Sequence, residues 1–508
     1  MSDPAPLDPI SRKSPIEPDP AAPRPASEEV RAGRGLIWKA AQLVGTKGLY
    51  LGGTLVLGYL LTPSDFGYVA IALVVTTSLM TATDTGMTPA LVQAHESLDE
   101  NYDVAWTIGV GRALLIFSIL FFGAPLLAQL FGDAKASVPI RLMAFWPLLM
   151  ALSSPRLADL IRTFRFPALA IIAIASVAAE TGVAISLASR LGGNAIVLGK
   201  LAGAACACIT SYFAAPYRPV IRFRYAASRQ LVSFGRWLFA IGITAVAGDL
   251  FMRVLISREL GVSALGLFAL ADRLAEAPMQ MAIEATGSIA LALYSRLRAD
   301  PERMAVALRA HLVGVMTFLL PATALIVALA GPLEHHVLGP AWVGASPLII
   351  VLALAYLIEL SFAAVSPLLQ AQGAGRRLFG VELAQYIALV AGVGFLTAPF
   401  ALMGAGIARI LASIVLQVGG SRLLRESLGT ALADVIRGAI VLAGAALLAG
   451  LAAWASAFFL DNLWGIVAGA LLGMIIFIAG GLGVDRLRRT GIRRSLAVFF
   501  PALGPRTP

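Results

Sequence analysis

Basic side chains stand inside segments that are otherwise apolar, and these residues could do chemistry. Lys47 lies in the middle of QLVGTKGLYLGG, where Gly45 and Gly48 leave room beside it, and Arg112 and Arg273 lie similarly deep. A charge in an apolar segment is costly unless it faces a cavity or a partner. Because guanidinium and ammonium groups bind phosphate strongly, these three residues are predicted to bind an anionic substrate. The competing interpretation of each is an ion pair between helices.

Acidic side chains occur in the same segments. Asp249 stands four residues before Arg253, a spacing that favours a pair on one helix face. A second cluster follows one span later and contains Arg273 between two carboxylates. Candidates for carrying protons or sodium ions are Asp84, Asp249, Asp272 and Glu276. Internal salt bridges are the favoured interpretation, and ion coupling is the alternative.

No motif of an enzyme or a metal site accompanies these charges. The sequence contains no Gly-rich phosphate loop, no HExxH, no GxSxG and no metal-spaced set of Cys and His. Cys206 and Cys208 point to different faces of one helix, so neither a disulfide nor a metal clip is favoured. The pair His335-His336 is expected to be interfacial. We therefore expect no catalytic residues, cofactor or metal.

The composition identifies the elements that must position the charges. Of 508 residues, 58% are hydrophobic and 13% are charged, whereas soluble chains carry about 25% charged residues. The chain is thus predicted to be an all-α integral membrane protein. Its net charge of +10 reflects basic residues in cytoplasmic loops, which is the usual bias of membrane proteins, and predicts no nucleic-acid partner.

Fourteen apolar segments are long enough to cross a bilayer. The predicted spans are 36–60, 66–88, 104–130, 138–156, 166–189, 194–215, 231–256, 264–290, 305–330, 344–370, 378–398, 401–421, 434–458 and 462–482. They divide the chain into a disordered tail (1–34), an N-lobe of six helices (35–216), a linker (217–230), a C-lobe of six helices (231–425), two final helices (426–484) and a basic tail (485–508).

Basic residues are concentrated in alternate connections. With the N-terminus inside, the outside loops hold Lys135, Arg141, Arg190 and Arg258, and the remaining loop and tail arginines are predicted to be inside. This asymmetry predicts that both termini are cytoplasmic. The acidic segment 95–103 is an exception, because it is predicted to lie inside.

The stretch Gly58–Gln93 is predicted to be a helical hairpin. Its first helix turns at LTPSD (61–65), and its second runs from about Phe66 to Thr83 and ends at DTG. Pro63 cannot continue a helix, and Ser64 or Asp65 is expected to cap the next one. The charge asymmetry places this turn on the periplasmic side.

A weak internal repeat relates the two halves of the chain. GLIWK at Gly35 matches FGRWL at Phe234, and the turn after Pro63 matches the one after Val262, so that Gly67 corresponds to Gly266. LFGDAKASVP (130–139) matches VLGPAWVGASP (337–347) more loosely. Two similar six-helix lobes imply a cavity between them and alternating access.

Taken together, these stretches resemble the Wzx-type oligosaccharide flippases, which are the polysaccharide transport family of the MATE-like superfamily. The resemblance covers about residues 35–425, and its most specific parts are LTPSDFG and LGPAW. The matching stretches are LTPSDFGYVAIA (61–72), DTGMTPALVQ (84–93), APLLAQLFGD (124–133), LIRTFRFPALA (160–170), SFGRWLF (233–239), RELGVSALGLFALADRLAEAPM (258–279), LYSRLRADPERM (293–304) and VLGPAWVGASPLI (337–349).

The resemblance implies a bacterial inner-membrane flippase for undecaprenyl-diphosphate-linked oligosaccharide repeat units. Expected partners are this lipid-linked substrate, membrane lipids, and the polymerase and export machinery of the same pathway. The family often has an acidic residue nine positions before the Gly of its RxLG stretch, where this chain has Met252. Asp249, one turn earlier, either takes that role or leaves it unfilled.

Three alternatives remain open at this point. A MATE-like drug or small-metabolite exporter would need a smaller and more aromatic pocket. A membrane polymerase, ligase or glycosyltransferase usually brings a long outside loop or a soluble catalytic domain, and the spans leave room for neither. A scaffold of the export apparatus is the third alternative.

Overall fold

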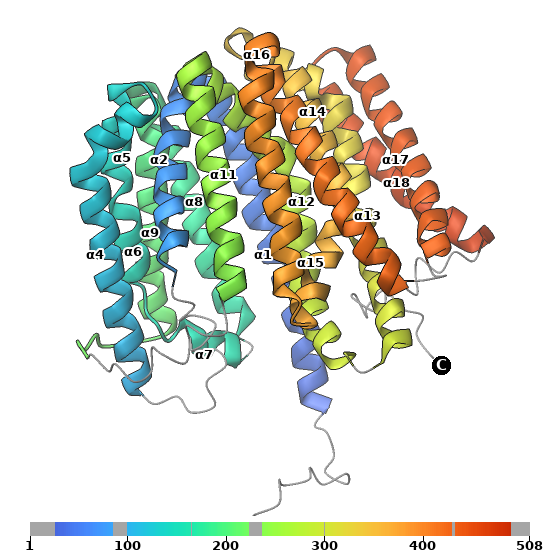
Figure 1. Cartoon of the computed structure of the whole chain (residues 1–508), viewed down its shortest axis with the longest axis horizontal. Coiled ribbons are helices and arrows are strands. Elements are labelled where there is room, and N and C mark those ends of the chain that lie inside the picture. Colours follow the sequence, from blue (N-terminus) through green and yellow to red (C-terminus); the bar gives the residue numbers. More distant parts are fainter. Residues whose placement is uncertain are drawn as a thin grey trace, which may run out of the picture.

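The computed structural model describes residues 26–84, 99–163, 165–222, 236–298, 300–428 and 432–488, and every regular element in these ranges is a helix (Figure 1). The predicted tails fall mostly outside the described residues, at 1–25 and 489–508. Residues 26–34, predicted to be disordered, instead form the start of the first helix. The predicted linker is described only up to residue 222, and the hairpin only up to Asp84.

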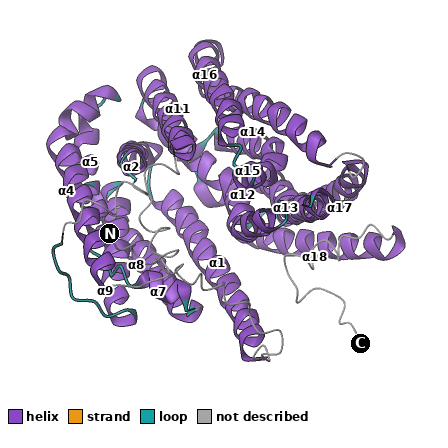
Figure 2. Ribbon diagram, turned by 60° about the horizontal axis from the view of Figure 1, so that its bottom comes forward, coloured by secondary structure: helices purple, strands orange, loops and turns teal. Residues whose placement is uncertain are grey.

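The helices follow the predicted spans closely. We keep the name N-lobe for α1 (Ala26–Leu60), α2 (Pro63–Ala82), α4 (Asp99–Leu130), α5 (Ser137–Met143), α6 (Phe145–Ala151), α7 (Leu157–Arg162), α8 (Phe166–Leu191) and α9 (Asn194–Ala214). We keep the name C-lobe for α11 (Arg236–Leu260), α12 (Val262–Arg296), α13 (Pro301–Leu333), α14 (Ala345–Ile358), α15 (Phe362–Ala371) and α16 (Gly375–Leu428). The final pair, α17 (Leu432–Leu460) and α18 (Leu463–Arg488), packs against α13 on the outer side of the C-lobe (Figure 2).

Ten helices of the described ranges are long and apolar enough to cross a membrane. One of them, Gly375–Arg425, holds two predicted spans, because at Ala401 (φ 48°, ψ −134°) the backbone leaves the helical region. The predicted span 138–156 is broken into α5 and α6, and the span 344–370 is broken at Glu359–Ser361. The all-helical membrane fold is thus confirmed, whereas the number fourteen stays a prediction.

The turn of the first hairpin is capped by a residue other than the two expected. Thr62, rather than Ser64 or Asp65, is the N-cap of α2, and Pro63 occupies the first helical turn. The Thr62 side chain accepts from the Asp65 backbone N–H, while the Asp65 carboxylate accepts from the Thr62 N–H, which is a capping box. Asp65 Oδ1 also accepts from Gly193 N at 2.8 Å. The turn is therefore fixed to the start of α9.

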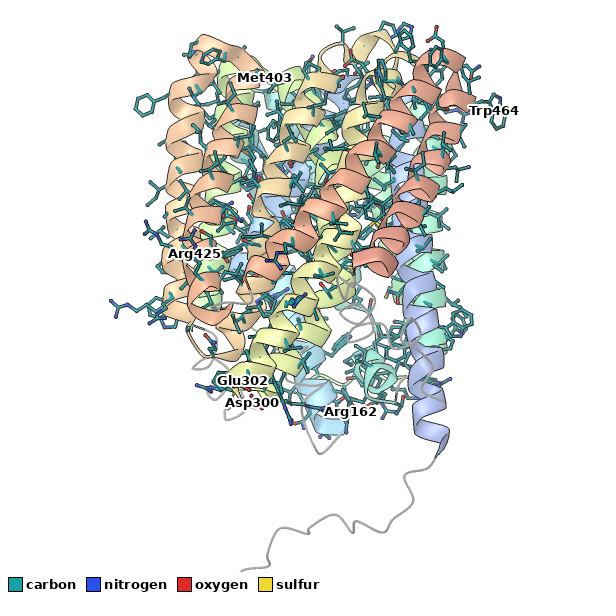
Figure 3. The ribbon with its side chains drawn as sticks, turned by 90° about the vertical axis from the view of Figure 1, so that its right-hand side faces the viewer. Arg162, Asp300, Glu302, Met403, Arg425 and Trp464 are labelled. Carbon is teal, nitrogen blue, oxygen red and sulfur yellow. The ribbon has the colours of Figure 1, made fainter. Side chains whose placement is uncertain are left out.

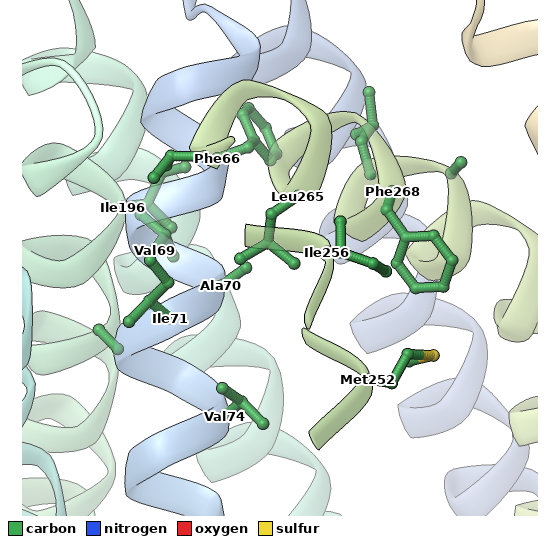
Figure 4. Close-up of a cluster of buried hydrophobic side chains, with 14 of the residues drawn as sticks. Phe66, Val69, Ala70, Ile71, Val74, Ile196, Met252, Ile256, Leu265 and Phe268 are labelled. Atoms are coloured by element: carbon green, nitrogen blue, oxygen red, sulfur yellow. The ribbon is translucent and has the colours of Figure 1, made fainter. Parts of the chain in front are cut away.

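The main apolar core joins both lobes at the level of this turn. Phe66, Val69 and Val74 of α2 lie beside Leu265 and Phe268 of α12 in one buried cluster (Figure 4). Ile256 and Met252 of α11 complete it on the C-lobe side. Burial of apolar surface stabilises such a core by about 25 cal/mol per Å². Each lobe thus contributes to a shared core.

Two glycines make the closest contact in this core. A Cβ added to Gly266 would overlap the carbonyl oxygen of Pro63, and one added to Gly67 would overlap that of Val262. The backbones of α2 and α12 therefore touch without side chains between them. Gly67 and Gly266 are the residues that the internal repeat matches, and the structure places them face to face.

The two loops matched by the repeat reach across to the opposite lobe. The carbonyl of Phe131, in the N-lobe loop, accepts a hydrogen bond of 2.8 Å from Ser257 at the end of α11. Trp342, in the C-lobe loop, is fully buried, donates from Nε1 to Gly58 O at 2.7 Å, and packs edge-on against Phe66. We call the ends of the lobes joined by these contacts and by the glycine pair the closed end.

The opposite end carries the charged connections. Figure 3 shows Arg162, Asp300, Glu302 and Arg425 there, and Met403 and Trp464 at the closed end. Asp103, from the acidic segment expected inside, accepts from Tyr217 at 2.7 Å and lies 3.8 Å from Arg222. Burial, and then this hydrogen bond to Asp103, raise the pKa of Tyr217. Within the acidic segment 95–103, the negative charge of Asp103 is therefore compensated by Arg222. Residues 95–98 of that segment lie outside the described ranges.

Candidate functional site

A cavity of about 240 Å³ lies between the lobes, next to the closed end. Its N-lobe wall is apolar apart from two hydroxyl groups, and its C-lobe wall is charged. The N-lobe side consists of Tyr50 of α1 and of Phe66, Val69, Ala70, Leu73, Val74 and Thr77 of α2. The C-lobe side consists of Asp249 and Arg253 of α11 and of Ala269, Asp272, Arg273 and Glu276 of α12.

Arg253 forms ion pairs with two carboxylates of the charged wall. Its Nε lies 2.9 Å from Asp249 Oδ2 one turn away, and its Nη2 lies 3.2 Å from Asp272 Oδ2 on α12. Tyr356 of α14 donates to the other oxygen of Asp272 at 2.8 Å. The predicted pair Asp249–Arg253 is therefore formed, and Asp272 joins it through space. Both acids are held in salt bridges, as the favoured interpretation predicted.

Arg273 is the cation of this wall without a carboxylate partner. Its guanidinium lies 4.1 Å from the centre of the Tyr50 ring and donates to the Tyr50 hydroxyl. No carboxylate within the described ranges lies within ion-pair distance of it. The Tyr50 hydroxyl takes the edge that carries Nε and Nη2, which leaves the Nη1 donors for an incoming anion.

Lys47 lies on the same face of α1, three residues before Tyr50. Its Nζ is 2.7 Å from Glu284 Oε1 of α12, and both side chains are partly exposed, by 26% and 47%. Gly48 has open space beside it as expected, whereas Gly45 meets Ile174 of α8 at 3.3 Å. Lys47 and Arg273 thus both bridge α1 to α12, although Lys47 does not line the cavity.

Arg112 is placed apart from these two residues. Its Nη1 lies 3.3 Å from Asp84 Oδ1 and 3.3 Å from Thr83 O, beyond the C-terminal end of α2. Neither Arg112 nor Asp84 lines the cavity. The two predicted site residues pair with each other within the N-lobe, as the ion-pair interpretation required.

Glu276 is the acidic candidate that forms no ion pair with a basic side chain in the part of the chain that the structure describes. It lines the cavity and accepts a hydrogen bond of 2.6 Å from Gln280 on the next turn of α12. Met252, at the family's acidic position, is buried in the apolar core, whereas Asp249 reaches the cavity. On α11 the cavity is therefore lined by Asp249 and Arg253, which stand before and after the family position.

Two residues of the site, Tyr50 and Tyr356, were not predicted from the sequence. Both are uncharged and give no signal in an apolar segment, although Tyr50 follows Lys47 at helical spacing. Behind the charged wall, Arg409 lies over the Tyr356 ring and pairs with Glu359 at 3.2 Å. Glu359 also accepts from Ser413 at 2.7 Å and Gln385 at 2.9 Å. This interior cluster, of Glu359, Gln385, Arg409 and Ser413, supports the wall from within the C-lobe.

The N-lobe has a charged pair of its own. Lys200 Nζ lies 3.2 Å from Glu180 Oε1 and 5.0 Å from the centre of the Trp146 ring. Within the described ranges no three His, Cys, Asp or Glu side chains are placed to hold a metal ion. His336 pairs with Asp461 at 3.0 Å, which ties the C-lobe loop to the turn before α18.

Known proteins match this chain in sequence and in fold. A family model described as "Polysaccharide biosynthesis protein" matches residues 56–347. The succinoglycan biosynthesis transport protein ExoT of Rhizobium meliloti (strain 1021) is 28% identical over 367 residues, which are 71% of this chain and 74% of that protein.

Two solved structures share the fold. The lipid II flippase MurJ, in an inward closed conformation, superposes with a TM-score of 0.67 at 14% identity and covers 89% of this chain and 99% of its own. An inward-facing multidrug resistance MATE family transporter superposes with a TM-score of 0.58 at 12% identity, over 79% of this chain and 99% of its own. At these identities the likeness shows the fold alone. The family match shows that this chain belongs to the polysaccharide biosynthesis protein family, and its multi-pass helical fold is the one that MurJ and the MATE family transporter share.

Proposed function

We propose that this protein flips undecaprenyl-diphosphate-linked oligosaccharide repeat units across the bacterial inner membrane for the biosynthesis of a polysaccharide. The observation that carries the proposal is Arg273, a guanidinium without a carboxylate partner in a cavity between two lobes. A diphosphate offers the bidentate anionic partner that such a group prefers. The name of the relative ExoT, a succinoglycan transport protein, and that of the fold neighbour MurJ, a lipid II flippase, support the same substrate class.

The proposed mechanism is alternating access between the lobes of residues 35–216 and 231–425. The substrate enters from the charged end while the closed end is shut, and its diphosphate reaches Arg273. Lys47 exchanges Glu284 for the anionic substrate, which removes an ion pair between α1 and α12. The lobes then rock about their shared core, with residues 217–230 as the linker and 426–484 moving with α13.

Ion coupling is proposed at Glu276 rather than at Asp84, Asp249 or Asp272. Those three carboxylates are occupied by arginines, whereas Glu276 faces the cavity with a neutral partner. Glu276→Gln should therefore remove any dependence of transport on a proton or sodium gradient in proteoliposomes. Normal gradient dependence of this variant would exclude Glu276.

The site is tested by export in a host that lacks its own copy of the gene. Arg273→Gln should lower polymer output most, Lys47→Gln less, and Arg112→Gln least, because Arg112 pairs with Asp84 away from the cavity. Arg273→Lys keeps the charge but loses the bidentate fork, and should restore part of the output. Equal protein levels in the membrane are the control. Full export by the Arg273→Gln variant would show that Arg273 is not part of the substrate site.

The function itself is tested by where the lipid-linked repeat units collect. Deletion should leave them in the cytoplasmic leaflet, whereas loss of a polymerase would leave them in the periplasmic leaflet. Drug sensitivity without accumulated repeat units would instead identify a small-molecule exporter. Alkaline phosphatase fusions test whether both termini are cytoplasmic, and co-purification tests whether the polymerase is a partner.

A further inference from the structure

A second cavity, of about 440 Å³, lies against α12 on the C-lobe. We call it the lower cavity, because it is lined by the half of α12 that leads away from the closed end. Its sides are mainly apolar. The lining from α12 is Met279, Ile283, Gly287 and Leu291. The opposite side comes from the short helix η5 (Glu359–Ser361), which contributes Glu359, and from α15, which contributes Phe362, Ala363, Ser366, Pro367 and Gln370.

One stripe of α12 lines both cavities. Glu276, Ile283 and Gln280 follow Arg273 at 3, 10 and 7 residues, and Gly287 follows at 14, which are spacings that keep to one helix face. The stripe is charged at Arg273 and Glu276. Further along it, Ile283, Gly287 and Leu291 line the lower cavity and are apolar, and Glu284 beside them is held by Lys47. At 1.5 Å per residue, Arg273 and Ile283 are about 15 Å apart along the helix.

A glycine creates the hollow of the lower cavity. A Cβ added to Gly287 would meet only Ile283 of its own helix, at 3.8 Å, so nothing from the opposite wall fills the space. The one carboxylate at the edge, Glu359, is already held by Arg409, Ser413 and Gln385. The space therefore offers an apolar ligand a surface and offers an ion no free partner.

We infer that the lower cavity holds the hydrocarbon chain of the same amphiphile whose anionic head lies at Arg273. This inference rests on the proposed function. The continuity of the stripe favours the substrate's own chain over the acyl chain of an ordinary phospholipid, because the head site and the chain site lie on one helix about 15 Å apart. The bound lipid then has its head nearer the closed end than its chain.

Two probes with one head test the inference: a citronellyl-diphosphate-linked and an undecaprenyl-diphosphate-linked disaccharide, bound to the purified full-length protein. Gly287→Leu should weaken binding of the long-chain probe roughly tenfold, since it fills the hollow, and leave the short-chain probe unchanged. Ala363→Leu fills the same space from α15 and serves if the first variant does not fold. Gly394→Leu, at an exposed glycine of α16 with open space beside it, is the matched control and should change neither.

Separate outcomes overturn the inference and the function. Equal binding of the two probes by the unaltered protein, or a Gly287→Leu variant that binds the long probe normally, would overturn the chain site. Displacement of the long probe by excess phosphatidylglycerol would show that the cavity takes any lipid chain. Arg273→Gln should weaken both probes. If neither probe binds the unaltered protein, the proposed function fails.

Discussion

The two lobes are alike where they close and unlike where they face the cavity. At the closed end each lobe contributes one glycine, Gly67 or Gly266, and one loop that reaches the other lobe. At the cavity the N-lobe presents the largely apolar face of α2, whereas the C-lobe presents Asp249, Arg253, Asp272, Arg273 and Glu276.

This difference indicates that closing the lobes and binding the substrate make different demands on the two halves. Closure depends on the shape of the backbone, and both halves of a repeat can have the same backbone shape. Binding an anionic head needs charged groups, and among the lining residues of the cavity only those of the C-lobe carry them, so binding does not require the two walls to be alike. The following four predictions test this division.

Replacing the charge pairs as units should give the largest contrast between the lobes. A buried pair exchanged for neutral groups of similar shape is often tolerated in stability. Lys200→Met with Glu180→Gln should therefore keep transport within about twofold, whereas Arg253→Met with Asp249→Asn and Asp272→Asn, which exchanges the whole group that Arg253 joins, should lower it roughly 100-fold, or about 2.7 kcal/mol. Transport per folded protein and the Tm in detergent are the measurements. Equal losses from the two combined variants would contradict the division.

The glycine contact should respond equally from either side. Gly266→Ala and Gly67→Ala each insert a methyl group into backbone contact, which should weaken the closed state by about 1–2 kcal/mol, or roughly 5- to 30-fold. Labelling of a cysteine at Ser64 by an impermeant maleimide, with Cys206 and Cys208 replaced by Ser, measures the opening.

Gly48→Ala, which has open space beside it, is the control for these variants. If only one of the two glycines is sensitive, the closure is less symmetric than the contacts indicate.

The two loops that reach the opposite lobe should stabilise the closed end less than the glycine contact does, and one loop more than the other. Ser257→Ala removes one hydrogen bond, to Phe131 O, and should weaken closure by about 1 kcal/mol. Trp342→Phe also removes one hydrogen bond, to Gly58 O, but in addition loses part of a fully buried ring, so its effect should be the larger. The labelling assay at Ser64 measures both. If Ser257→Ala weakens closure more than Trp342→Phe does, the contact of Trp342 is not the stronger of the two.

The smallest of the four effects is expected from acid, through protonation of Asp133 in the N-lobe loop, on the stability of the protein. Burial alone would raise the pKa of Asp133, but hydrogen bonds from Tyr68 and from the Lys135 backbone, together with the Lys135 charge, lower it on balance. A lowered folded pKa means that the stabilisation is present above the ordinary value of 3.8 and is lost as the pH falls through the folded value.

The Tm of the unaltered protein should thus fall slightly more than that of Asp133→Asn when the pH is lowered from neutral to below 3.8. An identical fall in both proteins would remove Asp133 as the cause.

The fold could be predicted from the sequence to a large extent, because apolar length and charge placement mark each span directly. The repeat was the most useful signal: the turn with Gly67 and Gly266 and the two loops meet at the closed end. The residues that cap and end the helices were harder to predict. At the start of α2, for example, Thr62, Ser64 and Asp65 can all accept backbone hydrogen bonds.

The site could be predicted only in part. Depth along a helix is readable from the sequence, but the direction in which a side chain points depends on how helices rotate against one another. Lys47 and Arg112 looked equivalent for this reason, although one bridges α1 to α12 and the other pairs with Asp84. Tyr50, which covers Arg273, carries no charge that would mark it.

The contact between Gly67 and Gly266 has a mechanical consequence. It lies close to one end of α12, and Arg296 at the other end is about 45 Å away at 1.5 Å per residue. If the lobes pivot at this contact, a rotation of about 10° would separate their far ends by about 8 Å over that length. The lobes would then rotate about the glycine pair. A rotation too small to disturb the backbone contact there would open, at the charged end, a passage wide enough for a sugar ring.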